Sequence, residues 1–405
     1  MAKKKYLAVA AGTVTLAAAT TTTTTSTATT TTTAPTTTTS STTTTSTATT
    51  ALPSGYTAVS ASSFGVKCDG VTNDTVALQN AFNGLKSYQA LQLPSGSCLY
   101  SRQLSLYGKS NVMLIGAGKD ATVLTATDPL HSSLIVSSGN TIGLSGFQVY
   151  SPNSTTRTTD ADSRGIYVEN SSAISIDSVK VRKVAGAGIL YYIVNGGKVT
   201  NSVVDSSLAD AFHFTGGSQN ILAQFDTATG AGDDCFASIG YGTNINRNVQ
   251  FLDNSCSDNV ASGVSFEGTT GGQAYRNKLT RTGVSAIRVA SISGWATGPV
   301  DQIDIRDNVL TDVKTRTDVD HSAVMVFTDR SSISNVTLAG NTISNPRTYD
   351  GARVLNYVSG TATISNVTIA NTAISSTGSV TRCFTLGSGL GALSFSTNSL
   401  NTQPC

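Results

Sequence analysis

Three aspartates in one short stretch are the residues best suited to chemistry. Asp210 opens the segment DAFHF, Asp234 opens the similar segment DCFAS, and Asp233 stands just before it. The 24 residues between Asp210 and Asp234 are about one turn of a coiled β-solenoid. Neighbouring strands lie about 4.8 Å apart, so three carboxylates would share one patch and raise one another's pKa. Because paired acid and base carboxyl groups hydrolyse glycosidic bonds, the sequence predicts such a site here.

Each of these side chains also has an ordinary structural interpretation. A single aspartate in a β-solenoid turn commonly bonds backbone amides, but three on adjacent coils favour function. His213 could bind substrate, tune the aspartates or be a satisfied groove histidine. Arg288 could pair with a carboxylate, bind sugar hydroxyls or be solvated, and Trp295 could stack on a sugar or pack against the protein.

A repeat must position these residues. From about residue 130, short segments share a pattern of small, apolar, variable and apolar positions, and their spacings are 23, 23, 24, 28, 23 and 37 residues. These segments are RGIYV (164–168), AGILY (187–191), DAFHF (210–214), DCFAS (234–238), SGVSF (262–266), SAIRV (285–289) and SAVMV (322–326). Such a period indicates a solenoid, and the longer steps indicate loop insertions, which tend to cluster on the binding face.

Alternation along the segments assigns each side chain to the inside or the outside of the coil. In DAFHF, Phe212 and Phe214 should point inward and His213 outward. The positions equivalent to His213 are Tyr167, Leu190, Ala237, Ser265 and Arg288. We therefore predict an open groove beside the aspartates. The residues expected to bind substrate there are Arg164, Tyr167, His213, Ser265, Glu267, Arg288 and Trp295.

Composition and the N-terminal sequence narrow the class of protein. Net charge is +2 with 12 % charged residues, and basic runs are absent beyond the N-terminus, so no nucleic-acid surface is expected. Residues 1–19 combine a Lys3–Lys5 cluster, an apolar core and an A-x-A site, which predicts a signal peptide. Residues 20–52 are rich in Thr and Ser and predict a disordered stalk or linker. The remainder, 53–405, should be one catalytic domain of a secreted or cell-surface monomer with no membrane contact beyond export.

Six cysteines in an exported chain can all form disulfides. Cys235 and Cys256 are separated by about one coil and should be bonded to each other. Proximity favours Cys68 with Cys98 and Cys383 with Cys405, although six cysteines allow 15 connectivities. No zinc, phosphate-loop or EF-hand spacing occurs, so no metal or other cofactor is expected, while the aspartate cluster leaves calcium open.

The N-terminal block resembles a known family. The segment VALQNAFNGL at 76–85 has helical spacing behind a polar cap. With the preceding residues it forms FGVKCDGVTNDTVALQNAF, which resembles the first segment of pectate-lyase-3-like proteins, with Cys68 replacing a residue that is usually Gly or Asn. The resemblance implies an all-β fold, a right-handed parallel β-helix with an N-terminal capping helix.

The central motifs resemble hydrolases of the same fold. G-D-D-C at 232–235, with Asp210 one coil earlier, is similar to the polygalacturonase clan, which implies an inverting mechanism with Asp233 as acid and Asp210 and Asp234 activating water. Ala261-Ser262-Gly263 lacks the histidine of that clan, and Arg288-Val289-Ala290 lacks its lysine. DAFHFTGGSQN and GAGDDCFAS look closer to glycoside hydrolase family 87, with Ala211 replacing a Gly of that family, which implies mycodextranase or α-1,3-glucanase activity.

The sequence therefore predicts a secreted glycoside hydrolase that cleaves an α-1,3 or mixed α-1,3/α-1,4 glucan. The alternatives are a polygalacturonase-like hydrolase, a polysaccharide lyase or epimerase, and a non-catalytic adhesin or carbohydrate-binding surface protein. An adhesin has no reason to gather three carboxylates on adjacent coils, whereas a lyase would need an arginine base close by.

Overall fold

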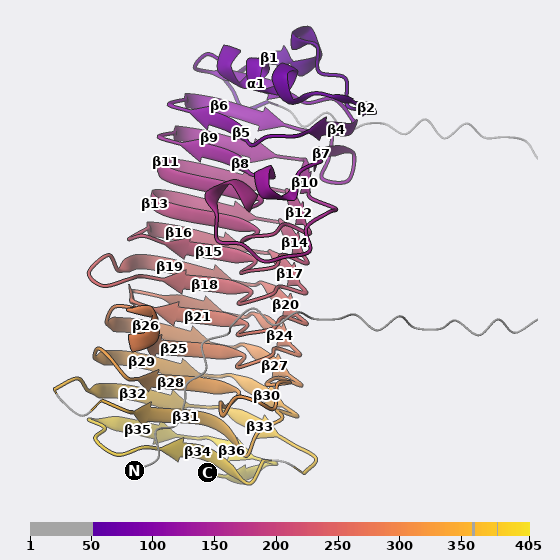
Figure 1. Cartoon of the computed structure of the whole chain (residues 1–405). Helices are drawn as coiled ribbons and strands as arrows, with labels where there is room; N and C mark the ends of the chain where they lie inside the picture. The colour runs from indigo at the N-terminus through magenta and orange to yellow at the C-terminus, as the bar shows by residue number, and fades with distance from the viewer. Residues whose placement is uncertain (1–51, 359–360, 379) are drawn as a thin grey trace, which may run out of the picture. The chain divides into compact units, whose positions relative to one another are not determined.

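The computed structural model describes residues 52–358, 361–378 and 380–405, and in this part of the chain the backbone winds as a right-handed parallel β-helix (Figure 1). A typical coil holds three short strands, as in β15 (Phe212–Thr215), β16 (Gln219–Gln224) and β17 (Thr227–Thr229). Each strand pairs in parallel with its equivalent one coil away, for example Phe212 with Ile189 and Phe236. The predicted fold class is confirmed.

The first strands of the coils form the sheet face that borders the aspartates. They are β5 (Leu104–Tyr107), β8 (Leu134–Ser137), β11 (Ile166–Asp177), β13 (Ile189–Thr200), β15, β18 (Phe236–Ile239), β21 (Val264–Glu267), β25 (Ile287–Ser291), β28 (Val324–Thr328), β31 (Asp350–Asn356) and β34 (Arg382–Leu386). Strands β11 and β13 are long enough to continue onto the second face, which joins both faces into one hydrogen-bonded sheet.

The second and third strands of the coils complete the helix. The second face holds β1 (Thr57–Ser60), β3 (Gln89–Gln92), β6 (Ser110–Ile115), β9 (Asn140–Ser145), β16, β19 (Asn246–Leu252), β22 (Thr269–Thr270), β23 (Gln273–Tyr275), β26 (Val300–Arg306), β29 (Ile333–Ala339), β32 (Ile364–Ala370) and β35 (Leu393–Ser396). The third holds β2 (Asp69–Asn73), β4 (Gly96–Tyr100), β7 (Thr122–Ala126), β10 (Gln148–Tyr150), β12 (Lys180–Arg182), β14 (Val203–Asp205), β17, β20 (Ser255–Ser257), β24 (Lys278–Thr280), β27 (Val309–Thr311), β30 (Thr342–Ser344), β33 (Ala373–Ser375), β36 (Ser399–Leu400) and β37 (Gln403–Pro404).

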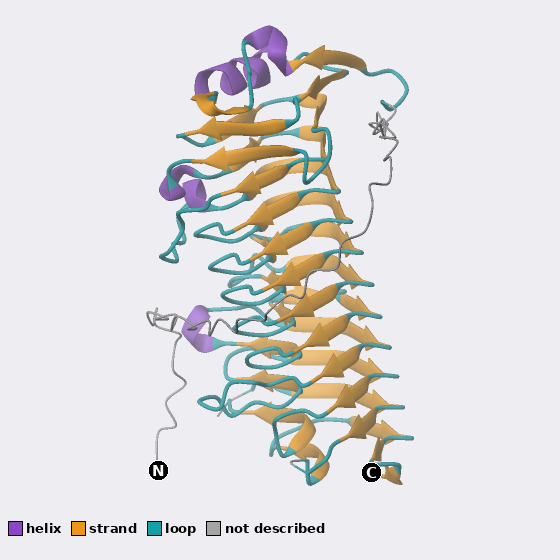
Figure 2. Ribbon diagram, turned by 90° about the vertical axis from the view of Figure 1, so that its right-hand side faces the viewer, coloured by secondary structure: helices purple, strands orange, loops and turns teal. Residues whose placement is uncertain are grey.

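One α-helix, α1 (Thr75–Gly84), lies at the N-terminal end of the stack of coils (Figure 2). It buries Leu78, Ala81 and Phe82 against the first coil, and so covers apolar side chains that no preceding coil could bury. Short 3₁₀ turns occur at η1 (Ala61–Phe64), η2 (Pro129–His131), η3 (Ala161–Ser163) and η4 (Ser293–Trp295). The capping helix predicted at 76–85 is confirmed within one residue.

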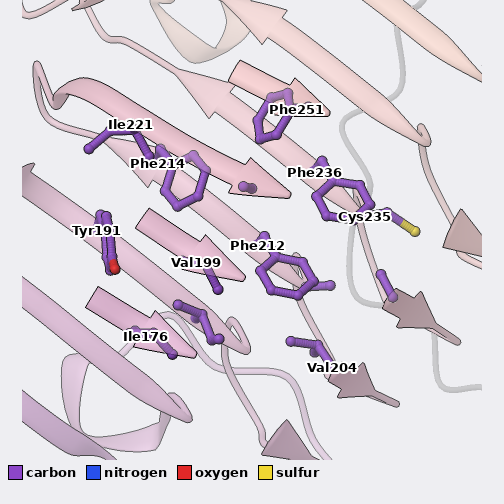
Figure 3. Packing of buried hydrophobic residues seen from close by; sticks show 14 of the residues in the cluster. Ile176, Tyr191, Val199, Val204, Phe212, Phe214, Ile221, Cys235, Phe236 and Phe251 are labelled. Atoms are coloured by element: carbon purple, nitrogen blue, oxygen red, sulfur yellow. The ribbon is translucent and has the colours of Figure 1, made fainter. Parts of the chain in front are cut away.

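Aromatic side chains stack along the interior of the coils (Figure 3). The rings of Phe212 and Phe236 are parallel at 4.9 Å, and Phe251 packs between Phe214 and Phe266 at 5.8 and 5.4 Å. All five rings are fully buried. The inward orientation predicted for Phe212 and Phe214 is confirmed, and offset aromatic contacts of this kind stabilise beyond their buried area.

Three disulfides link the cysteines as the spacing favoured. Cys235 bonds to Cys256, Cys68 to Cys98 and Cys383 to Cys405. The Cys235–Cys256 bond joins the turn that carries Asp234 to the third strand of the coil that begins there, because Cys256 lies in β20. Restricting the unfolded chain in this way stabilises the site-bearing coils.

A row of buried asparagines runs along the turn that precedes the third face. Asn254, Asn277 and Asn308 each donate their side-chain amide to a main-chain carbonyl on the previous coil, at 2.8 to 3.0 Å. Asp226 occupies the preceding position in this row: its Oδ1 accepts from Ser202 N, whereas its Oδ2 is buried without a hydrogen-bond partner. Burial raises the pKa of Asp226 well above the usual carboxyl range.

We expect Asp226→Asn to stabilise the protein at neutral pH. An asparagine can donate to the previous coil where a carboxylate cannot, which is worth about 1–3 kcal/mol. Because the folded-state pKa of Asp226 is raised, the wild type loses stability as pH rises above about 4. Thermal unfolding between pH 4 and 8 should show the advantage of the variant growing with pH. Asn254→Asp, the reverse change one coil on, should destabilise increasingly with pH; a pH-independent difference in either variant would contradict the assignment.

The predicted signal peptide lies outside the described residues. So does the predicted Thr/Ser-rich stalk, 20–52, apart from its last residue, Leu52. Among the described residues, no helix has the length and apolar character needed to cross a bilayer.

Candidate active site

Coil stacking brings the aspartates together. Asp210 and Asp234 each lie two positions before a strand, β15 and β18 respectively, and Ala211 N donates to Asp234 O at 2.9 Å, so the two residues are neighbours on adjacent coils. Gly232, which precedes the pair Asp233–Asp234, lies against the backbone of Leu208, where an added Cβ would be 2.4 Å from the carbonyl oxygen. Only glycine lets the coils approach closely enough at this point.

The three carboxyl groups form a tight cluster. One oxygen of each of Asp210, Asp233 and Asp234 lies within 4.8 Å of the others. Inverting hydrolases typically separate their acid and base carboxyl groups by about 6.5–9.5 Å, whereas the nearest oxygens of this cluster are closer. Coil spacing explains the difference, because adjacent positions on stacked strands are about 4.8 Å apart.

Each carboxyl group has its own basic partner. His213 Nδ1 lies 2.6 Å from Asp210 Oδ2, Arg157 Nη2 donates to Asp233 Oδ2 at 2.6 Å, and Arg288 Nη2 donates to Asp234 Oδ2 at 2.9 Å. The main chain adds further donors: Asp234 N to Asp210 Oδ1 at 3.0 Å, and Ser262 N to Asp234 Oδ1 at 2.6 Å. Both oxygens of Asp210 and of Asp234 thus accept hydrogen bonds, which fixes their orientation.

These contacts separate the pKa values of the three groups. Burial, reinforced by the charges of Asp210 and Asp234, raises the pKa of Asp233 to about 7, despite the opposing charge of Arg157. Burial opposes ionisation of Asp210 too, but His213 and Arg157 hold its pKa below the usual value. Burial raises the pKa of Asp234 against the opposing effect of Arg288. The cluster therefore contains one carboxyl that retains a proton near neutrality and one that ionises readily, which suits acid and base roles.

Glu267 is a fourth carboxyl group at this site. It is fully buried, and its Oε1 lies 2.9 Å from the same Arg288 Nη2 that binds Asp234, although neither Glu267 oxygen has hydrogen-bond geometry. Its neighbours in the strand register, Ile239 and Ala290, are apolar. Burial raises the pKa of Glu267 to about 7. A buried charge is costly, so its presence in an apolar row points to a function through Arg288.

Several polar atoms of the site are buried without a hydrogen-bond partner among the described residues. They are His213 Nε2, Ser265 Oγ and Arg288 Nε. These three residues share one row of the sheet, separated by Ala237, as the repeat predicted. Buried unpaired donors and acceptors are costly, and sugar hydroxyl groups could satisfy them.

The predicted open groove is wrong in its degree of exposure. Asp210, Asp234, Ser265 and Arg288 are all buried. Trp295 in η4 lies over Arg288 with the guanidinium carbon 5.7 Å from the ring centroid, and 42 % of the tryptophan is exposed. Arg288 is therefore enclosed by Trp295 and the two carboxylates Asp234 and Glu267, and Glu267, predicted to bind substrate, has no surface with which to do so.

Two other predicted binding residues lie farther along the same row. Tyr167 is two coils from His213 in the register, and its ring packs against Arg164 at 4.3 Å. Its hydroxyl donates to Glu169 at 2.9 Å. Tyr167 and Arg164 share the face of the aspartates without contacting them.

Sequence reasoning missed Arg157. It lies in the loop between β10 and η3, and reaches Asp233 across 76 residues of sequence. That loop has no strand repeat from which its position could be calculated. Tyr241 was also missed: burial and the charges of the four carboxyl groups raise its pKa to about 12, which places it close to the cluster.

The aspartate oxygens are also the kind of ligand that calcium prefers. Arg157 and Arg288 already supply positive charge to Asp233 and Asp234, and His213 Nδ1 lies 2.6 Å from an oxygen of Asp210. Side chains of the protein already occupy oxygens of all three carboxyl groups, so the residues present fit a metal ion poorly. No step of the chemistry below uses a metal.

A parallel β-helix with clustered carboxyl groups on one face is the architecture of polysaccharide-processing β-helix proteins. A family model described as rhamnogalacturonase A/epimerase, pectate lyase-like, matches residues 58–265, just over half of the 405-residue chain. The chain belongs to this family. The resemblance drawn from the N-terminal block and the G-D-D motif is thereby confirmed.

Individual relatives are more distant. Polygalacturonase-2 of Solanum lycopersicum is 24 % identical over 251 residues, which are 56 % of this chain and 53 % of that protein, so the chain spans about half the length of this curated relative. The Agl-KA catalytic domain matches with a TM-score of 0.70 and 21 % identity over 87 % of this chain and 66 % of that one. A GH87 α-1,3-glucanase catalytic unit from Streptomyces thermodiastaticus matches at 0.65 and 18 % over 86 % and 69 %. These structures share the fold.

Proposed function

We propose that this protein is a glycoside hydrolase that cleaves a polysaccharide at the aspartate cluster. The observation that carries the proposal is the set of three carboxyl groups within 4.8 Å, each held by a different basic side chain. One of them retains its proton near neutral pH, as a general acid must. Membership of a polysaccharide-processing family supports the same conclusion.

Asp233 is the general acid in this proposal. It is the partly exposed member of the cluster, so it can reach the glycosidic oxygen, and its pKa of about 7 keeps it protonated at mildly acidic pH. Asp210 and Asp234 are the base pair that orients and deprotonates the attacking water. Arg288 and Glu267 act as positioning residues, because Arg288 holds Asp234 and Glu267 in turn pairs with Arg288.

We propose inversion at the anomeric carbon, in spite of the short carboxyl separation. A retaining enzyme needs a carboxylate oxygen free to attack carbon. All four oxygens of Asp210 and Asp234 already accept hydrogen bonds. This arrangement suits two carboxylates that orient one water better than it suits a carboxylate that acts as the nucleophile. Proton NMR of the first product decides this point: a product with the anomeric configuration opposite to the substrate is expected, and a retained one would contradict inversion.

An α-glucan is the proposed substrate, with α-1,3 or mixed α-1,3/α-1,4 linkages. Support comes from the motifs DAFHFTGGSQN and GAGDDCFAS and from the fold shared with α-1,3-glucanases. Three disulfides fit an oxidising, extracellular location. Reducing-sugar release should be measured on α-1,3-, mixed α- and β-glucans and on polygalacturonate. Hydrolysis of none of them would contradict the proposal, and hydrolysis of polygalacturonate alone would correct the substrate.

A polysaccharide lyase is the second candidate, since two arginines lie at the cluster. Arg157 and Arg288 both contact carboxylates, and these contacts raise the pKa of each guanidinium. A base with a raised pKa abstracts protons poorly, so the electrostatics favour hydrolysis. Formation of an unsaturated uronate, detected by its ultraviolet absorbance, would establish the lyase instead.

The pH profile of kcat/KM should fall on the alkaline side near pH 7. Asp233 must be protonated to donate, and its pKa is about 7, so activity is present below that pH and is lost above it. Arg157→Gln removes a cation that lowers this pKa, so the alkaline limb should move to higher pH by about one unit. Arg182→Gln, which breaks an ion pair on the third face, serves as control. An alkaline limb that stays in place in Arg157→Gln would contradict the assignment of Asp233 as the acid.

A further inference from the structure

A cavity lies on the same side of the coils as the aspartates. It has a volume of about 570 Å³ and is lined by Lys314, Thr317, Asp318, Val319, Asp320, Arg347, Thr348 and Tyr349. The loop between β27 and β28 forms one side of the cavity. This loop belongs to the longest interval between repeat segments, the 37 residues from Ser285 to Ser322. Insertions of this kind tend to decorate the binding face of a solenoid.

Main-chain hydrogen bonds fix the position of this cavity relative to the aspartates. Val260 N donates to Ala231 O, Val284 N to Ala261 O, and Arg316 N to Gly283 O, each at 2.9 Å. The loop therefore stacks on the turn that contains Asp233, three coils farther toward the C-terminus, or about 14 Å at about 4.8 Å per coil. The pKa of Arg316 is raised mainly by Asp318 and also by the charge of Asp233, which is consistent with this proximity.

The walls of the cavity are held by internal ion pairs. Arg316 pairs with Asp318, and Arg353 pairs with both Asp320 and Asp350. Lys314 is only 8 % exposed and donates to Arg316 O at 2.6 Å. These contacts hold donors and acceptors around the cavity in place, so little side-chain conformational entropy is lost when a ligand binds.

An exposed aromatic ring completes the cavity. Tyr349 is 68 % exposed, while its main-chain oxygen accepts from Thr381 N at 2.9 Å. The adjacent Asp350 is anchored by Ser322 Oγ at 2.6 Å and by Arg353. A rigid backbone that carries an exposed tyrosine provides a platform on which the apolar face of a sugar ring can stack.

We propose that this cavity is a distal subsite for a neutral sugar unit of the same glycan chain that is cleaved at the aspartates. The charges around the cavity nearly cancel: Lys314, Arg347 and the two arginines behind the lining, Arg316 and Arg353, face the carboxylates of Asp318, Asp320 and Asp350. Such surroundings offer donors and acceptors to hydroxyl groups and carry too little net charge to select a uronate. The inference rests on the proposed hydrolase activity and adds a binding site to it.

The test compares substrates of different lengths in Tyr349→Ala. Loss of the stacking platform should raise KM about 3- to 10-fold for the polymer and for long oligosaccharides. It should leave kcat, and KM for di- and trisaccharides, unchanged, because these substrates cannot span three coils. Tyr88→Ala, which removes another exposed tyrosine at the N-terminal end, is the matched control.

Binding is measured independently of hydrolysis by affinity electrophoresis in gels that contain neutral α-glucan or polygalacturonate. Tyr349→Ala should be retarded less than the wild type by the neutral glucan. The subsite would be overturned if Tyr349→Ala had the same KM as the wild type for long substrates, or if its KM rose as much for short substrates as for long ones. Stronger retardation of the wild type by polygalacturonate than by the neutral glucan would also overturn it. If the wild type hydrolysed no glycan, the hydrolase proposal would fail, and the electrophoresis would still decide whether Tyr349 contributes to glucan binding.

Discussion

Asp233→Asn should lower kcat on the natural glycan by at least about a hundredfold, the low end of the effect of a general acid. Asparagine keeps the size of the side chain but cannot deliver a proton to the leaving oxygen. Because Asp233 is the partly exposed member of the cluster, folding should be retained, and the melting temperature should change little. Rates and thermal unfolding of the same preparations provide the measurement.

The leaving group supplies a sharper criterion. An aryl glycoside with an acidic phenol needs no proton to depart, so Asp233→Asn should recover much of its activity on such a substrate. Asp210→Asn and Asp234→Asn should not, because they impair activation of water. Asp253→Asn, which breaks the exposed ion pair with Arg276, is the control. Near-wild-type turnover of natural glycan by all three site variants would place the active site elsewhere.

Arg288→Met should abolish activity and destabilise the fold at the same time. The change leaves Asp234 and Glu267 buried without their shared cation, and removal of one partner from a buried ion pair costs about 3–5 kcal/mol. For a chain of this size such a loss lowers the melting temperature by roughly 4–7 °C. Calorimetry and kcat measured well below the transition separate the two effects.

A second substitution distinguishes stability from catalysis. In Glu267→Gln/Arg288→Met one of the two orphaned charges is removed, so part of the lost stability should return while activity stays absent. Leu310→Ala, a truncation in the core of the third face, should cost about 2–5 kcal/mol and keep the kcat of the folded enzyme. Recovery of activity in the double variant would show that Arg288 acts through stability alone.

Much of the site could be predicted because a solenoid converts sequence spacing into spatial register. Asp210 and Asp234 lie on adjacent coils for the same reason that Cys235 reaches Cys256, since both separations approximate one coil. The row of His213, Ser265 and Arg288 follows from the same period. Alternation along each strand then placed Phe212 and Phe214 in the core.

Burial and long-range partners could not be predicted in this way. Arg288 reaches back over two coils to Asp234, and Arg157 enters from a loop with no repeat, so neither contact has a sequence period. Alternation assigns a side chain to the outside of the coil but does not say what packs over it there: Arg288 lies beneath Trp295 and is buried.

The sequence by itself determined the coil, its register and which aspartates share a patch, and it favoured the disulfide pairs that form, because these depend on backbone periodicity. Only the tertiary structure decided which cation neutralises each carboxylate, that Glu267 is sealed beneath Arg288, and that the 37-residue step forms a cavity lined by Lys314 and Tyr349. The physical reason is that loop paths and long side chains settle by local packing and charge pairing, which have no fixed repeat along the chain.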